Sequence, residues 1–179
     1  MRGGKNHMQI ASRAGVSFVV VALLVGVSAP VTFANDEAAG PLPPAVEQTF
    51  RAAFPTGKLD KLDVDDENGV IVYDLEFKDG AIEKETDIAA DGTMLEVTTV
   101  VEASAVPPAA MASVRKAADG ATIKRIEHID ISHEIKDGTI VKMSKPETHF
   151  SVEMQKTKLG PIAEITVNSD GTVLEPPQW

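Results

Sequence analysis

Histidine is the side chain in this sequence best suited to ligate a metal or act as a general base, so its spacing comes first. The chain of 179 residues has four histidines and no cysteine. The lack of cysteine excludes a thiolate nucleophile, a thiolate metal site and a disulfide. His128 and His133 are five residues apart, which on a β-strand places them on opposite faces. His149 could face His133 across a hairpin, but no metal-ligand spacing accompanies them. We therefore predict no metal ligand and no cofactor.

Serine is the next candidate nucleophile, and it lacks the context that catalysis needs. A reactive serine requires a base held beside it and a strained local backbone. No serine of this chain lies in a G-x-S-x-G motif, or in an S-x-x-K motif accompanied by its partner motifs. A glycine-rich phosphate-binding loop is absent as well. We predict that the protein is not an enzyme and has no catalytic residue.

Acidic residues crowd the segment from Asp63 to Gly69 (DVDDENG), which could suggest a calcium loop. An EF-hand loop needs glycine at its sixth position and glutamate at its twelfth. Counted from Asp63, those positions hold Asn68 and Asp74, and no helix is expected on either side. We interpret the segment as a solvated turn between two strands, with weak calcium binding as the alternative.

A second acidic group is defined by alternation along strands. Alternate residues of a strand share one face, and here acidic residues alternate with apolar ones. Like charges on neighbouring strands repel one another unless a cation answers them. We therefore predict a face that binds a basic protein, a peptide or divalent ions. The alternative is a surface that keeps an acidic protein soluble. The candidate residues are Asp74, Glu76, Glu83, Glu85, Asp87 and Glu96.

A helix and about four strands would have to position this face. Prolines in a first turn and apolar residues at helical spacing predict a helix that begins near Pro43 and stops at Pro55. A first strand is expected around 59–64. Asp79-Gly80 and Asp91-Gly92 predict tight turns between the later strands. The buried face of the second strand is predicted to consist of Ile71, Tyr73, Leu75 and Phe77.

The same order of predicted elements occurs twice in the sequence. Leu42-Pro43-Pro44-Ala45 recurs as Val106-Pro107-Pro108-Ala109, and ETDIAADGTMLE (85–96) aligns with EITVNSDGTVLE (164–175) at six of 12 positions. The two offsets are 64 and 79, so the second copy holds about 15 extra residues, placed between 133 and 147 and expected to form a hairpin or extend two strands. We predict an α+β fold of two tandem repeats, each one helix packed on a roughly four-stranded antiparallel sheet.

Pro-Pro-Ala, a short amphipathic helix, paired strands and a D-G-T-x-L-E turn together resemble the PepSY-like domain, present here in tandem. The form is similar to that of beta-lactamase inhibitor proteins and covers residues 43–101 and 107–175. The resemblance implies an exported or envelope protein, a helix-on-sheet unit, and binding or inhibition of other proteins, often peptidases. Those inhibitors present aromatic side chains on a concave sheet. Tyr73 is expected in the core here, so inhibition of a beta-lactamase is not carried over.

The first 34 residues resemble an export signal. Arg2, Lys5 and Arg13 make a positive start, and small residues precede a cleavage point after Ala34. The apolar core, 16–27, has 12 residues, whereas a membrane span needs about 20. Residues 35–42 are interpreted as a flexible leader. Cleavage would leave 14 basic and 27 acidic residues, a formal charge of −13 that excludes nucleic-acid binding through a basic patch.

These expectations combine into one functional prediction. We expect an exported, monomeric binding or inhibitory module of the cell envelope, in the periplasm or outside the cell, which acts through a sheet surface. Its partner is predicted to be an unknown protein or peptide, basic or a peptidase. The alternative is a structural or divalent-cation-binding acidic envelope protein. No membrane span is expected after signal cleavage.

Overall fold

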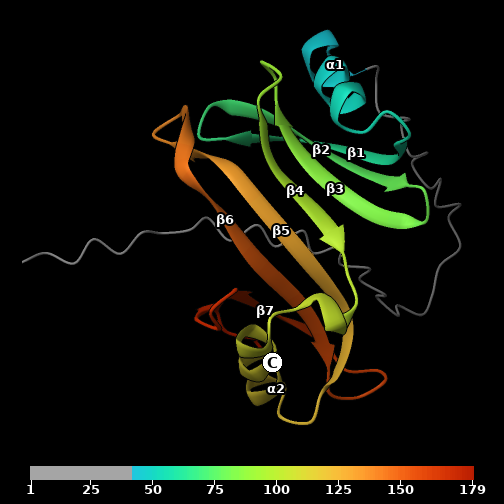
Figure 1. Ribbon diagram of the computed structural model, residues 1–179, viewed down its shortest axis with the longest axis vertical. Coiled ribbons are helices and arrows are strands. Elements are labelled where there is room, and N and C mark those ends of the chain that lie inside the picture. The colour runs from blue at the N-terminus through green and yellow to red at the C-terminus, as the bar shows by residue number, and fades with distance from the viewer. Residues whose placement is uncertain (1–41) are drawn as a thin grey trace, which may run out of the picture. The chain divides into compact units, whose positions relative to one another are not determined.

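The computed structural model describes residues 42–179, which form two α-helices, a short 3-10 helix and eight strands (Figure 1). The predicted signal and all of the predicted leader except Leu42 lie outside the described residues. No helix among residues 42–179 combines the length and apolarity needed to cross a membrane. In chain order the elements are α1 (Pro44–Ala53), β1 (Lys58–Glu67), β2 (Val70–Asp79), β3 (Ile82–Ala89), β4 (Met94–Val100), η1 (Ala103–Ala105), α2 (Pro108–Ala118), β5 (Thr122–Lys136), β6 (Thr139–Gln155), β7 (Ile162–Asn168) and β8 (Val173–Glu175).

Both helices begin at the prolines that the sequence singles out, and α1 also ends where the sequence predicts. Each has a proline in its first turn, where the missing N–H costs no helical hydrogen bond. Helix α1 ends at Ala53, two residues before Pro55. Helix α2 ends at Ala118, because the next residue, Asp119, has a left-handed φ of 47°. Helices of this length are marginal alone in water, so their stability comes from the sheet beneath them.

Each helix packs its apolar stripe on a separate part of the sheet. Under α1, the rings of Phe50, Phe54 and Phe77 touch one another, with centroids 4.6 to 5.8 Å apart. Ile71 was expected in this core but is 38% exposed, because it lies at the start of β2, outside the residues that pack under α1. The core under α2 comprises Ala110, Met111, Val114, Ile126, Phe150, Val152, Met154, Ile165 and Val167 with their neighbours.

The eight strands form one antiparallel sheet in sequence order, so the expected α+β fold of two separate helix-on-sheet repeats is wrong. Residues Glu96–Val100 of β4 pair directly with Glu127–Ile131 of β5, and the result is a mainly β fold. Two separate four-stranded sheets would leave unpaired backbone N–H and C=O groups along two edges at this position. Joining β4 to β5 satisfies those groups. Alternation in the sequence identifies strands, but it does not say which edges meet.

Strand register places both helices on the same face of this sheet. Val97 packs in the core under α1, and it lies opposite Asp130 of β5. Side chains two residues apart on a strand share a face, so Asp130, His128 and Ile126 point the same way. Ile126 belongs to the core under α2. The opposite side, here called the helix-free face, carries the residues that alternate with these.

The predicted insertion forms the outer half of a long hairpin made by β5 and β6, as expected. Ile135 and Ile140 of this hairpin pack against a third apolar cluster on the helix-free face, formed by Val72, Ala89 and Leu95. At the tip, a Cβ placed on Gly138 would lie 2.8 Å from the Asn68 carbonyl oxygen in the β1–β2 turn. The hairpin therefore contacts the strands of the first half through apolar residues and a close backbone approach.

Candidate functional site

The structure places all six predicted acidic residues on the helix-free face. Register sets Asp74 opposite Asp87, Glu76 opposite Glu85, and Asp87 in turn opposite Glu96. The sixth residue, Glu83, lies opposite Lys78. Like charges directly opposite on neighbouring strands destabilise a sheet by up to about 1 kcal/mol per pair. This part of the sheet therefore brings like charges together on neighbouring strands.

Three of these residues converge more closely than the others. Carboxylate oxygens of Asp74, Glu85 and Asp87 all lie within 4.8 Å of one another, and we call this group the carboxylate cluster. Burial, followed by the charges of Asp74 and Glu127, raises the pKa of Glu85 from 4.5 to about 8. No lysine or arginine within residues 42–179 forms an ion pair with Glu85. Its carboxyl group therefore keeps a proton at neutral pH.

Asp87 departs from the sequence prediction in its exposure. It was expected on a solvated face but is 1% exposed. Its strand β3 runs between β2 and β4, so Asp87 has Asp74 on one side and Glu96 on the other. A buried carboxylate costs free energy unless its charge is answered by a cation or a hydrogen-bond donor. The cluster is thus partly withdrawn from water.

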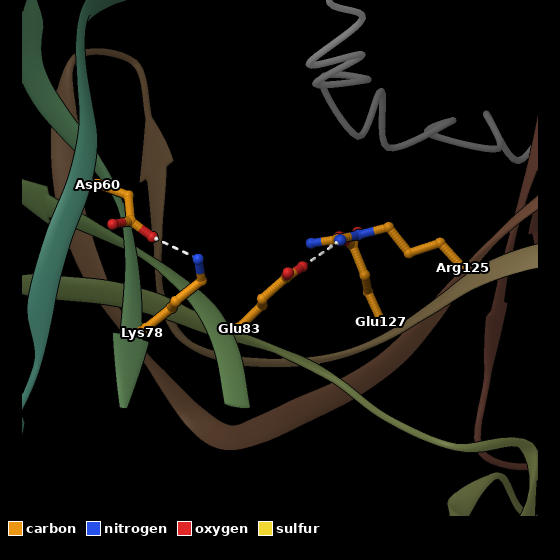
Figure 2. Close-up of polar contacts among 5 residues, drawn as sticks. All are labelled: Asp60, Lys78, Glu83, Arg125 and Glu127. Atoms are coloured by element: carbon orange, nitrogen blue, oxygen red, sulfur yellow. Dashed lines mark hydrogen bonds and ion pairs between the residues drawn. The ribbon is translucent and has the colours of Figure 1, made fainter. Parts of the chain in front are cut away.

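Arg125 of β5 is a neighbour of this acidic face that sequence reasoning missed (Figure 2). Its Nε donates a hydrogen bond to Glu127 at 2.6 Å, and its Nη1 donates one to Glu83 at 2.8 Å. It thereby links β3 to β5 across β4. The sequence gives only a weak indication of this contact. Arg125 and Glu127 are two residues apart on one strand and therefore share a face. The approach of Arg125 to Glu83, however, depends on the pairing of β4 with β5.

Lysines form ion pairs with other carboxylates near the edge of the sheet. Lys61 lies 3.0 Å from Glu76 and 2.6 Å from Asp63, and hydrogen bonds to these two carboxylates raise its pKa. Lys78 lies 3.5 Å from Asp60, with both side chains about half exposed (Figure 2). Glu76 and Glu83 are therefore balanced by described cations. Glu85, by contrast, has no ion-pair partner among residues 42–179.

On β5 to β7 the carboxylates of the helix-free face have more hydrogen-bond and cationic neighbours. The hydroxyl of Ser151 donates a hydrogen bond of 2.6 Å to Glu164. Burial, and after it the charge of Glu127, raises the pKa of Glu153, while Arg125 acts in the opposite direction. In this part of the face the hydroxyl of Ser151 and the guanidinium of Arg125 therefore act on the carboxylates. Around Glu85, by contrast, three carboxyl groups converge.

The histidines form separate local contacts. The ring of His128 stacks on Phe150 with a centroid distance of 5.2 Å. His149 Nε2 lies 3.2 Å from a carboxylate oxygen of Glu147. Register pairs His133 with Lys142 and His149 with Ile129, so His133 and His149 do not face each other across the hairpin.

One serine lies beside a histidine, but the hydrogen bonds around the pair are not those of a nucleophile and its base. Ser132 Oγ is 3.0 Å from His133 Nδ1, and that nitrogen is 2.9 Å from the carbonyl oxygen of Met94. A carbonyl only accepts, so Nδ1 carries the proton and cannot act as a base toward Ser132. Ser132 Oγ also lies 3.1 Å from the carbonyl oxygens of Met94 and Leu95. The pair fastens β5 to β4 at a bulge.

Comparison with known proteins finds similarity in structure. No family model matches the chain, and no curated protein matches it in sequence. A DUF2874 family protein from Bacteroides uniformis is 15% identical, with a TM-score of 0.56 over 74% of this chain and 86% of that chain. A protein from Bacteroides eggerthii, described as a proposed periplasmic protein, is 14% identical, with a TM-score of 0.58 over 78% of this chain and 89% of that chain.

A BLIP-like protein from Bacteroides fragilis is 18% identical, with a TM-score of 0.52 over 79% of this chain and 90% of that chain. At these identities the similarity shows the fold alone, and the fold is BLIP-like. The resemblance to PepSY-like domains stays a prediction, since no family model matches.

Proposed function

We propose that this chain is an exported, non-enzymatic binding module that docks a lysine- or arginine-rich segment of a partner protein on its helix-free face. The observation that carries the proposal is the carboxylate cluster: three carboxyl groups within 4.8 Å, with Glu85 given no ion pair by any residue of 42–179. A cation from a partner would relieve the repulsion among them. Membership of the PepSY-like family is part of the same proposal.

The electrostatics favour a cationic partner over a neutral one. The chain carries a formal charge of −10, and carboxylates concentrated on one face steer positively charged ligands toward it. Glu85 is protonated near neutral pH, with a pKa of about 8. A lysine or guanidinium group brought beside it would favour the ionised form, so docking would release a proton. Affinity would therefore rise between pH 7 and pH 9.

The structural comparisons support an envelope role without specifying a target. One similar structure is described as a proposed periplasmic protein and another as BLIP-like. The periplasmic description agrees with the export signal that the sequence predicts. Placement of both helices on one side leaves the opposite face without a helical cover among residues 42–179. A partner can reach this face without displacing α1 or α2.

Binding of a divalent cation is the second candidate, favoured by the cluster geometry. Calcium and magnesium prefer oxygen ligands, and the carboxylate cluster can offer one oxygen from each of Asp74, Glu85 and Asp87. A bound cation would lower the pKa of Glu85 and remove the repulsion between β2 and β3. This function would make the protein an ion-binding component of the envelope.

Calorimetric titration separates the two candidates. The protein is titrated at pH 8 with an oligolysine peptide, and separately with calcium chloride. Docking predicts peptide binding that Glu85→Lys weakens at least tenfold and that the matched control Glu102→Lys, at an exposed position outside the face, leaves within twofold. Stoichiometric calcium binding below millimolar concentration, lost in Glu85→Lys, favours the second candidate. Equal behaviour of the two variants toward both ligands contradicts the proposal.

A further inference from the structure

A basic surface stands out at one end of this acidic chain. Residues 115–124 and 154–162 contain five basic side chains and one acidic one, a net charge of +4 in a protein of net charge −10. The basic residues belong to the end of α2, the start of β5 and the β6–β7 loop. We call them the basic corner: Arg115, Lys116, Lys124, Lys156 and Lys158.

Contacts within the structure bring these segments together. Lys156 Nζ lies 3.5 Å from the Asp119 carboxylate, which follows the last turn of α2. Strand β5 starts three residues after Asp119, and its first residue, Thr122, pairs with Gln155. The end of α2, the start of β5 and the end of β6 therefore meet at one place. Asp119 is the one acidic residue in segments 115–124 and 154–162, and it forms an ion pair with Lys156.

Apolar side chains protrude beside the basic corner. Leu159, in the β6–β7 loop, is 96% exposed, the highest value of any large apolar residue described. Ile162 is 55% exposed and Trp179 is 44% exposed. Lys156 Nζ lies 4.2 Å from the centroid of the Trp179 ring, which brings this aromatic side chain to the same place. We call Leu159, Ile162 and Trp179 the apolar tip.

The loop that carries Leu159 is held in shape by hydrogen bonds. The amide of Gly160 donates to the carbonyl of Thr157 at 2.9 Å, and the side-chain amide of Gln155 donates to the carbonyl of Gly160 at 2.8 Å. Leu159 lies inside this closed turn with its side chain in solvent. An exposed leucine at an ordered tip gains free energy when a partner covers it.

We propose that the basic corner and the apolar tip together dock on an anionic phospholipid surface. Lysines that surround a leucine and a tryptophan match the layers of a bilayer interface, where basic groups meet lipid phosphates and tryptophan lies at the headgroup level. Leu159 enters the boundary between headgroups and acyl chains, as the apolar side chains of interfacial segments do. The inference is independent of the function proposed for the helix-free face.

The charge distribution also fixes the orientation. A surface of anionic lipid repels the carboxylate-rich remainder of the chain and attracts the basic corner. Screening limits both effects to about 8 Å at physiological ionic strength, so contact depends on the residues that face the lipid. The association is consequently weak, reversible and sensitive to salt.

Trp179 is the single tryptophan of the chain and reports directly on this contact. The protein is expressed at full length and recovered after export, so that wild type and variants share one N-terminus. It is then mixed with phosphatidylglycerol vesicles or with phosphatidylcholine vesicles. The proposal predicts a blue shift of Trp179 emission and co-sedimentation with the phosphatidylglycerol vesicles alone, both reversed by 0.5 M salt, about the concentration at which the Debye length falls to about 4 Å.

Variants at exposed positions locate the contact without endangering the fold. Leu159→Ser and Lys158→Glu should each lower the fraction bound to phosphatidylglycerol vesicles at least fivefold. Matched controls elsewhere are Val64→Ser on β1 and Lys142→Glu in the β5–β6 hairpin, both exposed, which should leave it within twofold. No blue shift, an equal shift with both lipids, or unchanged binding of Leu159→Ser and Lys158→Glu would overturn the proposal.

Discussion

The hydroxyl of Thr49 in α1 donates a hydrogen bond of 2.7 Å to the carbonyl of Gly92, in the turn between β3 and β4. The same contact recurs in α2, where the hydroxyl of Ser113 donates to the carbonyl of Gly171 at 2.6 Å. Each helix is thereby tied to a turn more than 40 residues away in sequence. These two contacts set how closely each helix approaches the end of the sheet.

Removal of the Thr49 hydroxyl should destabilise the fold by about 1 kcal/mol, the usual net value of a part-buried hydrogen bond. Thr49→Val keeps the shape of the side chain and removes the donor, whereas Thr49→Ser keeps the donor. Urea unfolding should show a lower midpoint for Thr49→Val and a nearly unchanged one for Thr49→Ser. Equal midpoints for both variants would show that the hydrogen bond contributes nothing.

Gly171→Ala should be much more costly than Gly69→Ala, although both glycines have a φ of 88°. Strain at positive φ, about 1 kcal/mol, is common to the two variants. A Cβ at Gly171 would lie 2.6 Å from the Ala109 carbonyl oxygen, whereas a Cβ at Gly69 meets nothing within 4 Å. We expect Gly171→Ala to lose at least about 2 kcal/mol more in denaturant unfolding. A difference near zero would contradict the close packing of α2 on this turn.

The local elements of this fold could be predicted from the sequence, because each depends on neighbouring residues. Asp79-Gly80 and Asp91-Gly92 form the predicted turns, and their glycines have φ of 67° and 89°. The run from Asp63 is a strand end and a turn, in which Asp66 accepts a hydrogen bond from the Gly69 amide. The pairing of β4 with β5 could not be predicted, because period-2 alternation looks the same in an edge strand and in a central strand.

Loss of Arg125 should cost more than loss of Lys78, although both are cations in ion pairs on the helix-free face. Arg125→Gln leaves part-buried Glu127 without its 2.6 Å partner and releases Glu83, so we expect a loss of about 1 to 2 kcal/mol. Lys78→Gln breaks an exposed contact of 3.5 Å and should change stability by less than about 0.5 kcal/mol. Thermal unfolding at pH 7 in 0.15 M salt compares the two variants. A larger loss for Lys78→Gln would contradict this ranking.

Stability should fall as pH rises from about 4.5 to about 8, because the pKa of Glu85 is raised across that interval on folding. Between these values the folded state holds a proton that the unfolded state has released, so rising pH favours unfolding. The full shift would correspond to about 5 kcal/mol, and solvent screening of this incompletely buried group reduces it to about 1 to 2 kcal/mol.

Glu85→Gln removes that titration and tests its source. The variant should match the wild type below pH 4.5 and exceed its stability by about 1 to 2 kcal/mol at pH 9. Urea unfolding across pH 4 to 9 measures the difference, with Glu102→Gln as the control that keeps the wild-type slope. Parallel pH profiles for wild type and Glu85→Gln would place the titration elsewhere.

The candidate site was predictable in its membership but not in its electrostatics. Alternation alone put Asp74, Glu85 and Asp87 on one face, since side chains two residues apart on a strand point the same way. The burial of Asp87 depends on its neighbours in β2 and β4, and the link from Arg125 to Glu83 depends on register across three strands. Both follow from tertiary pairing, which leaves no local mark in the sequence.

The direct ladder between Glu96–Val100 and Glu127–Ile131 also has a consequence for folding. If one half unfolded, the other half would expose the unpaired backbone N–H and C=O groups of β4 or β5 to solvent. The small cores under α1 and α2 should therefore be lost together, and a destabilising substitution in one half should also destabilise the other. The chain should therefore unfold as one cooperative unit, and neither half is a self-sufficient fragment.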